Sequence, residues 1–368
     1  MHGLVAYCRP GFENDCAAEL QAKTAVLGVY GYCQTQPDRG YVIYRCQPEE
    51  ADHLGRKLAL KDLVFTRQFI VIVAEIMALQ ETDRVGQIAM ALLSAAEQHA
   101  ELAFKPAGDL RLETPDTNSA KELSKFCRKL TVPLRQGLRK ADILTTSESN
   151  KRPTLHAFFL SGQAVIIGYS YSYNQSRWHM GIPRLRMPSG APSRSTLKLE
   201  EAFAVFIPAN EHETRLHAGM NAVDIGAAPG GWTYQLVQRG MMVQAVDNGP
   251  MSPALMDTGQ VKHFQEDGFK FRPKKRNVQW LVCDMVEKPA RVGELMTSWL
   301  LEGYCQEAIF NLKLPMKKRY ALVAEYLEKM QAALQEEGRG RFEIQAKQLY
   351  HDREEITVHI RWLPRPSN

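Results

Sequence analysis

Short apolar runs alternate with longer amphipathic segments over the first 170 residues of the chain. Runs of β-branched, aliphatic and aromatic residues predict short strands at 4–8, 41–44, 69–73, 110–112, 155–160 and 164–168. Apolar positions at helical spacing predict helices at 12–23, from Asp83 onward and at 121–130. This is too little chain for a doubly wound sheet, so the pattern favours small α+β modules.

The pattern changes between Tyr173 and Arg194, where the turn-forming residues Gly, Pro, Ser and Asn are concentrated. Such a stretch is typical of a domain boundary, and its basic residues indicate more than a passive linker. We therefore expect two α+β segments, a basic linker and a C-terminal domain, at 1–80, 81–174, 175–193 and 194–368.

A helix is predicted at 196–205, with Ser195 or Thr196 as its N-cap. Lys198 falls in its first turn, where a cation opposes the helix dipole at a cost of under ~1 kcal/mol. A local rule that is broken without visible compensation marks a candidate functional position.

Length and composition limit the class of protein. With about 150 residues per domain, 368 residues predict two or three domains, and 45% apolar with 24% charged residues is typical of folded chains. No apolar run approaches the ~18 residues of a membrane span, and the N-terminus shows no signal peptide. Seven cysteines without a C-x-x-C spacing argue against disulfides and a zinc site, so we expect a cytoplasmic protein without a metal.

The net charge of +5 is unevenly distributed. Residues 121–152 carry nine Lys or Arg against three acids, and 153–199 contain no acid at all. Aromatic residues such as Phe126, Tyr173 and Trp178 are interleaved with this charge. Basic residues mixed with aromatic ones favour a nucleic-acid partner, and at this point either RNA or DNA would fit.

The segment 221–233 carries the clearest chemical signal, because an apolar strand runs into a glycine-rich turn that opens a helix. Asp247 ends the next predicted strand 21 residues after Gly226, near the spacing at which such folds bind a ribose diol. The dinucleotide fingerprint G-x-G-x-x-G is absent. Asp224 before the turn suits a ligand with an ammonium or sulfonium group, and S-adenosylmethionine carries both.

Further polar residues end the strands that follow. Asp267 and Asp284 come after the third and fourth predicted strands, and Lys313 ends the fifth. The carboxyl ends of parallel strands share one crevice, so we expect Asp284 and Lys313 to face each other. The predicted cofactor-binding residues are Ser195, Asp224, Gly226, Ala228, Pro229, Gly230, Gly231, Trp232, Asp247, Asp267 and Asp284.

The chain from about Ser193 onward resembles the FtsJ-type ribose 2'-O-methyltransferases, whose site is a lysine–aspartate–lysine–glutamate tetrad. The matching positions are Lys198 in S-x-x-K-L-x-E, Asp284 in V-C-D-M, Lys313 in N-L-K-L-P and Glu355 in R-E-E-I-T-V. Glu354 competes for the last place, and we prefer Glu355 because it directly precedes a predicted strand.

The resemblance extends over the whole chain. The segments C-R-P-G-F-E, K-E-L-x-K-F-C-R-K and M-G-I-P-R-L look like the bacterial 23S rRNA cytidine ribose 2'-O-methyltransferases of the RlmM type. The resemblance implies a Rossmann-like α/β methyltransferase domain dependent on S-adenosylmethionine, preceded by a smaller α+β region with a ferredoxin-like segment and a THUMP RNA-binding domain. It also implies a cytidine of 23S rRNA as the target, and we expect a monomer acting before large-subunit assembly is complete.

Transfer of a methyl group to a ribose 2'-hydroxyl needs a base, because the hydroxyl is a very weak acid, whereas the sulfonium leaves without acid catalysis. A lysine can act only when it is neutral, and a second ammonium group nearby together with desolvation favours that form. We therefore predict Lys313 as the general base and Lys198 as its cationic neighbour, with Asp284 and Glu355 orienting them.

Two alternatives remain open at this stage. A cytosine carbon-5 methyltransferase would need a cysteine nucleophile, and Cys283 adjoins Asp284, although no proline–cysteine motif accompanies it. A non-catalytic RNA-binding protein with a relic fold would keep the basic surface and lose cofactor binding. An amino-methyltransferase would show an N-P-P-Y-like tetrapeptide where Asp284 stands, and the sequence has none there.

Overall fold

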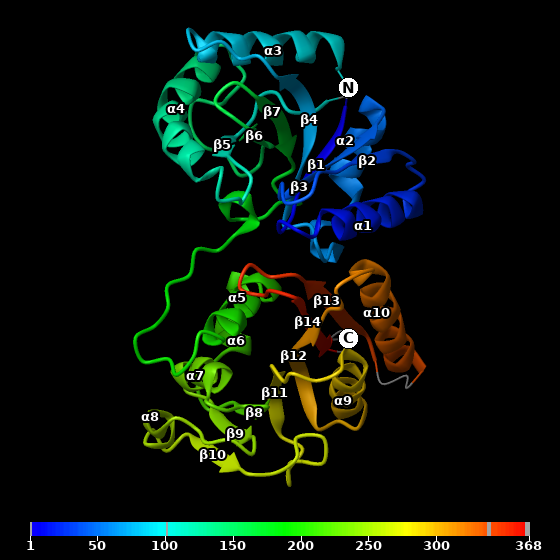
Figure 1. Cartoon of the computed structure of the whole chain (residues 1–368), viewed down its shortest axis with the longest axis vertical. Coiled ribbons are helices and arrows are strands. Elements are labelled where there is room, and N and C mark those ends of the chain that lie inside the picture. Colours follow the sequence, from blue (N-terminus) through cyan, green and yellow to red (C-terminus); the bar gives the residue numbers. More distant parts are fainter. Residues whose placement is uncertain (1, 101, 337–339, 365–368) are drawn as a thin grey trace. The chain divides into compact units, whose positions relative to one another are not determined.

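The computed structural model describes residues 2–100, 102–336 and 340–364, so the outermost predicted domain ends, 1 and 368, lie outside them. The chain divides into two compact units, Met1–Ile182 and Pro183–Asn368, each with its own seven-stranded sheet in the described residues (Figure 1). The predicted domain boundaries remain predictions. The division falls inside the predicted linker, and residues 175–182 belong to the first unit.

The first unit is an α+β structure whose sheet has the strand order β2-β3-β1-β4-β7-β6-β5. Neighbouring strands are antiparallel except β5 and β6, which are parallel. Since β4 pairs with β1 on one side and β7 on the other, one sheet runs through both predicted N-terminal segments. The elements are β1 (His2–Tyr7), α1 (Glu13–Val26), β2 (Tyr32–Gln34), β3 (Tyr41–Cys46), α2 (Pro48–Lys57), β4 (Gln68–Ile76), α3 (Arg84–Gln98), β5 (Asp109–Glu113), α4 (Lys121–Lys140), β6 (Thr154–Phe159) and β7 (Val165–Ser170).

Helix α4 is ten residues longer than its pattern predicted. Pro133 lies inside it, although proline removes a helical hydrogen bond. Cys127, Leu134 and Leu138 form a buried stripe on both sides of the proline. Burial of this apolar face therefore holds the helix together across a residue that the sequence marks as a helix end.

The second unit has the strand order β10-β9-β8-β11-β12-β14-β13, and the first five strands are parallel. Strand β14 runs antiparallel to β12, and β13 antiparallel to β14. This architecture confirms the predicted α/β class. The elements are α5 (Thr196–Phe206), α6 (His212–Arg215), β8 (Asn221–Ile225), α7 (Gly231–Gln238), β9 (Met242–Val246), α8 (Pro253–Met256), β10 (Val261–Phe264), β11 (Val278–Cys283), α9 (Pro289–Leu301), β12 (Cys305–Lys313), α10 (Arg319–Glu336), β13 (Phe342–Lys347) and β14 (Glu355–Trp362).

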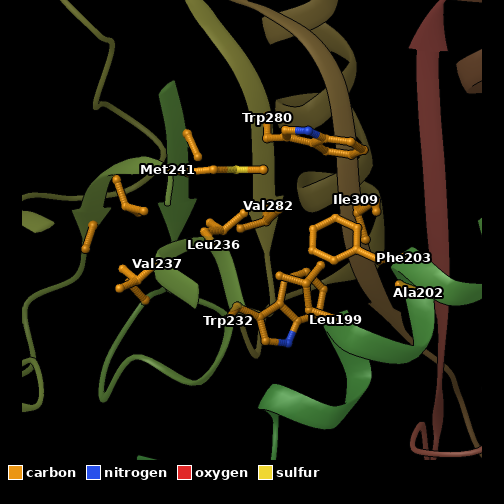
Figure 2. Packing of buried hydrophobic residues seen from close by; sticks show 14 of the residues in the cluster. Leu199, Ala202, Phe203, Trp232, Leu236, Val237, Met241, Trp280, Val282 and Ile309 are labelled. Atoms are coloured by element: carbon orange, nitrogen blue, oxygen red, sulfur yellow. The ribbon is translucent and has the colours of Figure 1, made fainter. Parts of the chain in front are cut away.

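The core of the second unit joins α5 and α7 to the face of the sheet that β9, β11 and β12 share (Figure 2). Phe203 of α5 packs edge-on against Trp280 of β11, with ring centroids 5.3 Å apart. Because side chains alternate along a strand, Trp280 and Val282 lie on this face. The packing fixes α5, and with it Lys198, at the sheet.

Ser195, one of the two predicted positions, is the N-cap of α5, but its hydroxyl does not cap the helix. Ser195 precedes the helix in a helical conformation and makes no capping hydrogen bond to the backbone. Its Oγ lies 2.7 Å from Oγ of Ser193, while the Thr196 hydroxyl accepts from Nε2 of Gln235 at 2.9 Å. These hydroxyls bind neighbouring side chains, so the start of α5 depends on tertiary contacts.

In the part of the chain that the structure describes, no helix is long and apolar enough to cross a membrane. Short 3-10 turns complete the secondary structure at Leu60–Asp62, His179–Gly181 and Ala209–Glu211.

Two adjacent methionines test the core of the second unit. Met241 is fully buried in the cluster and Met242 is 46% exposed. Met241→Ala should lower the free energy of unfolding by about 2–5 kcal/mol, because it leaves a cavity. Met242→Ala should change it by less than about 0.5 kcal/mol. Denaturant unfolding of both variants measures the difference, and equal losses would contradict this account of the core.

Candidate active site

Four side chains of the predicted tetrad meet at the carboxyl edge of the second sheet. Asp284 directly follows β11, and Lys313 is the last residue of β12. Glu355 begins β14 and lies opposite Lys313 in the antiparallel register. Lys198 reaches the same place from the first turn of α5. Strand order and register therefore bring together residues that are up to 157 positions apart in the chain.

Glu355 and Asp284 hold the two lysines in one ion-pair network. Nζ of Lys198 lies 3.1 Å from both carboxylate oxygens of Asp284 and 2.5 Å from Oε1 of Glu355. Lys313 donates to the other oxygen of Glu355. Among the described residues, Asp284 and Lys313 form no direct ion pair. Lys198 and Glu355 connect them instead, so the expected face-to-face arrangement is replaced by a chain of ion pairs.

Burial and charge act in opposite directions on these groups. Burial disfavours charge on Lys198, but the carboxylates of Asp284 and Glu355 outweigh it and raise its pKa. Burial likewise opposes charge on Glu355, but the two ammonium groups lower its pKa. For Asp284, burial outweighs the attraction of Lys198 and raises the pKa. Lys198 and Glu355 are thus the firmly charged pair of the network.

The rival residue Glu354 lies outside the network. Its side chain is 56% exposed and pairs with Arg319 at 3.1 Å. The Glu355 side chain is only 4% exposed and bonds to both lysines. Alternation along β14 separates the two neighbours, because adjacent strand residues point to opposite faces.

A cavity of about 550 Å³ opens beside Asp284. Five of the predicted cofactor-binding residues line this cavity: Gly226, Ala228, Asp247, Asp267 and Asp284. Its other lining residues are Val246, Asn248, Glu266, Gly268, Phe269, Met285, Val286, Glu287 and Arg291. Five carboxylates against one guanidinium make this wall strongly anionic, which suits a cationic ligand and would repel a pyrophosphate.

The glycine-rich turn allows close approach of three segments. Gly226 has φ +77°, and a Cβ there would lie 2.2 Å from the Met285 side chain. A Cβ on Gly231 would lie 2.1 Å from Oγ of Ser195. The turn therefore packs directly against the residues that lead into α5, and larger side chains would displace them.

Asp247 organises the turn from the end of β9. Its Oδ2 accepts from the backbone N–H of Ala228 at 3.0 Å, and Oδ1 accepts from that of Gly249 at 2.7 Å. Asp267 accepts from the backbone N–H of Phe269 at 2.9 Å. Both carboxylates are thus held by backbone donors at the cavity wall.

The other predicted cofactor residues do not line the cavity. Asp224 is buried, accepts from the Thr233 hydroxyl at 2.7 Å, and has its pKa raised to about 7 by burial. Trp232 is buried in the core against α5 (Figure 2). Ser195, Pro229, Gly230 and Gly231 shape the turn and the start of α5.

Sequence reasoning missed Asn311, whose Nδ2 donates to Oδ1 of Asp284 at 2.9 Å. Asn311 and Lys313 share one face of β12 because they are two positions apart on a strand. Sequence reasoning also missed Phe269 and Arg291 at the cavity wall. They form a cation–π contact, with Cζ of Arg291 4.2 Å from the centroid of the Phe269 ring. The strand period could have found Asn311, but the pairing of Phe269 with Arg291 of α9 has no sequence signal.

Sequence models of three families match the chain. The FtsJ-like methyltransferase family matches 191–339, so the second unit is of the FtsJ-like methyltransferase class. The RlmM ferredoxin-like domain matches 1–70, and the N-terminal part of ribosomal RNA large subunit methyltransferase M matches 83–171.

Curated relatives extend this match over the full chain. A ribosomal RNA large subunit methyltransferase M of Idiomarina loihiensis is 65% identical over 99% of this chain and 97% of its own length. Proteins of the same name from Photorhabdus asymbiotica and Aeromonas hydrophila are each 56% identical over 98% of this chain and 96% of theirs. The chain belongs to the ribosomal RNA large subunit methyltransferase M family, which confirms the predicted resemblance.

The family also confirms the predicted cofactor, S-adenosylmethionine. The cavity fits it, because carboxylates dominate the wall and the ligand carries an ammonium and a sulfonium group. When bound, the cofactor supplies the methyl group.

Asp247→Ala should raise the dissociation constant of S-adenosylmethionine about 10- to 100-fold, the loss expected for a charge-assisted hydrogen bond. It also removes the acceptor that holds the N–H groups of Ala228 and Gly249. Calorimetric titration measures the change. Asp257→Ala, at an exposed acid of the same unit, is the matched control and should leave binding unchanged. Equal affinities of wild type and Asp247→Ala would remove Asp247 from the site.

Proposed function

We propose that this protein transfers a methyl group from S-adenosylmethionine to the ribose 2'-hydroxyl of a cytidine in 23S rRNA, with Lys313 as the general base. The observation that carries the proposal is the ion-pair network of Lys198, Asp284, Lys313 and Glu355 beside an anionic cavity. The rRNA substrate is what the names of the full-length relatives support.

The asymmetry of the two lysines favours Lys313 as the base. Lys198 contacts two carboxylates, is 16% exposed, and has a raised pKa that keeps it charged. The side chain of Lys313 is 32% exposed and pairs with Glu355 among the described residues. A base must reach the substrate and lose its proton, and Lys313 has the better access and fewer anionic partners.

The remaining tetrad members act as positioning and charge-balancing groups. Asp284 lines the cavity and accepts from both Lys198 and Asn311, so its carboxylate is fixed in direction. Glu355 links the lysines, and its carboxylate stabilises the positive charge that Lys313 gains when it takes the hydroxyl proton. With both lysines protonated, the four groups bear two charges of each sign, and Lys313 must lose its proton before it can act as the base.

Cysteine-dependent methylation at a base is disfavoured by the surroundings of Cys283. The residue is fully buried in β11, and burial raises the pKa of its thiol far above the ordinary value. A nucleophilic cysteine needs a thiolate and access to the substrate, and this one has neither.

The first unit supplies the surface that we propose for RNA. On α4 and the following loop, seven basic side chains are solvent-exposed: Lys121, Lys125, Arg128, Lys129, Lys140, Lys151 and Arg152. Arg135 differs, because it pairs with Asp109 at 2.5 Å and Glu148 at 3.1 Å. The exposed residues would contact phosphates, while Arg135 holds the helix to β5.

We further propose that the protein acts in the cytoplasm as a monomer, on rRNA whose subunit is still being assembled.

Lys313→Ala should lower the single-turnover methylation rate by about 10²–10⁴, the usual loss when a general base is removed. Affinity for the cofactor should change little, because Lys313 does not line the cavity. The measurement is methyl transfer from radiolabelled cofactor at saturating RNA.

Lys313→Arg separates a base from a phosphate tether. Arginine keeps the positive charge but does not lose its proton near neutral pH. If Lys313 is the base, the Lys313→Arg enzyme should methylate as slowly as Lys313→Ala. If Lys313 is a phosphate tether, Lys313→Arg should methylate at close to the wild-type rate. A fast Lys313→Arg enzyme would exclude Lys313 as the base.

Reversal of three exposed charges on α4, with Lys125→Glu, Arg128→Glu and Lys129→Glu together, should weaken RNA binding. It should also make the slope of log K against log salt shallower by about 2–3, because each phosphate contact contributes ~0.7–0.9. Filter binding over a salt series measures both quantities.

The matched control reverses Lys23, Lys57 and Lys105, which lie on other parts of the same unit and change the net charge by the same amount. Cofactor affinity should stay constant in both triple variants, since the cavity belongs to the second unit. Equal losses of RNA affinity in the two variants would mean that only total charge matters, and would reject α4 as the binding surface.

A further inference from the structure

A row of buried polar side chains continues from Asp284 into the sheet. Asn311 of β12, Thr357 of β14 and Asp352 before β14 are each at most 1% exposed. Asn311 and Thr357 lie directly opposite each other in the antiparallel register of β12 and β14, which are neighbours in Figure 1. Buried polar groups without catalytic contact call for a physical explanation.

The contacts form one continuous path. Nδ2 of Asn311 lies 2.9 Å from Oδ1 of Asp284, and Oγ1 of Thr357 lies 2.8 Å from Oδ1 of Asn311. The same Thr357 oxygen is 3.0 and 3.2 Å from the two carboxyl oxygens of Asp352. Oδ2 of Asp352 accepts from the backbone N–H of Leu349 at 2.9 Å, so the path ends in a tight turn.

Hydrogen-bond chemistry gives this path a direction. Asp284 accepts from Lys198 through both oxygens, so Asn311 must turn its NH₂ group toward it and its carbonyl toward Thr357. The single hydroxyl hydrogen of Thr357 then goes to Asn311. The Thr357 oxygen has no hydrogen left for Asp352, and two unprotonated oxygens at this distance would repel each other.

We propose that Asp352 carries a proton in the folded protein and that Asp352, Thr357 and Asn311 form a directed hydrogen-bond chain that positions Asp284. The Asp352 carboxyl donates from Oδ1 to Thr357, Thr357 donates to Asn311, and Asn311 donates to Asp284. No proton is transferred along the chain. All three are positioning residues, and their effect on methylation rests on the proposed role of Asp284 beside Lys198.

The charges around Asp352 agree with a protonated carboxyl. The carboxylates of Glu201 in α5 and Glu355 in β14 both repel a charge on Asp352, and Lys198 is the opposing cation. Burial and these two carboxylates raise the pKa of Asp352 well above its usual range, against the Leu349 N–H and Lys198. Glu201 is itself held by the backbone N–H groups of Tyr350 and His351 at 2.8 and 2.9 Å.

Such a chain matters because burial disfavours the charged form of Asp284. Aligned donors that end on a carboxylate stabilise its charge and strengthen one another in a low-dielectric interior. Lys198 and Asn311 approach Asp284 from two elements, α5 and β12, and thereby fix its direction at the cavity wall.

The first test breaks the chain at Thr357. Thr357→Val removes the hydroxyl with little change of shape, and should slow single-turnover methylation up to about tenfold at saturating RNA and cofactor. Thr357→Ser keeps the hydroxyl and should stay within about twofold of wild type. Thr24→Val removes an equally buried hydroxyl in the first unit and should leave the rate unchanged. A wild-type rate for Thr357→Val, with Lys313→Ala slow, would reject the chain and leave the proposed function intact.

The second test measures the proton on Asp352 without any methylation. Asp352→Asn replaces the carboxyl by an amide that accepts from Leu349 and donates to Thr357, but does not ionise. A folded-state pKa above the unfolded one contributes stability at low pH that is lost as the pH rises. The unfolding constant of wild type relative to Asp352→Asn should therefore rise between pH 5 and 9, by up to about tenfold per pH unit. A ratio that stays constant over this range would mean that Asp352 is ionised, and would overturn the proposal whatever the function of the protein.

Discussion

The contact of Glu355 with two lysines is the constraint on which the second unit depends. A carboxylate that is 4% exposed is costly to bury unless ammonium groups compensate it, and Lys198 and Lys313 both do so. The antiparallel register of β12 and β14 sets Lys313 opposite Glu355, and the α5–α7 packing brings in Lys198. Core packing and charge pairing therefore support each other. A shift of α5 would leave the buried charge of Glu355 without Lys198, and loss of the ion pairs would remove one of the contacts that hold α5 to the sheet.

The same edge of the sheet serves the cavity. Asp284 belongs both to the ion-pair network and to the cavity wall, so the arrangement of the lysines and the proposed methyl donor are linked through one side chain. Asp247 holds the glycine-rich turn, which packs so closely against 193–195 that a Cβ at position 231 would displace the Ser193 and Ser195 hydroxyls. The proposed catalytic residues and the proposed cofactor site thus share one set of strand ends, as expected for parallel α/β sheets.

Several features could be predicted from the chain alone. The apolar strand before Gly226, the spacing to Asp247 and the polar residues at strand ends predicted a ligand-binding turn and five of the fourteen residues that line the cavity. Lys198 stood out because it opposes the helix dipole, and the structure places its compensation in Asp284 and Glu355, which lie 86 and 157 residues away. The predicted helix 121–130 ended before Pro133, whereas α4 continues to Lys140, because the burial of Leu134 and Leu138 that stabilises it is a property of the packed unit.

The sequence by itself determined the class of fold, the family, the cofactor and the residue types at the site, because strand period, glycine spacing and motif identity are local properties. Only the tertiary structure decided which side chains form ion pairs and hydrogen bonds with each other. It put Lys198 between Asp284 and Glu355, separated Glu354 from the site, buried Trp232 and Asp224, and joined Asn311 to Thr357 and Asp352. Strand order, register and burial set these partners, and they act between residues that are far apart in the chain, where no local pattern records them.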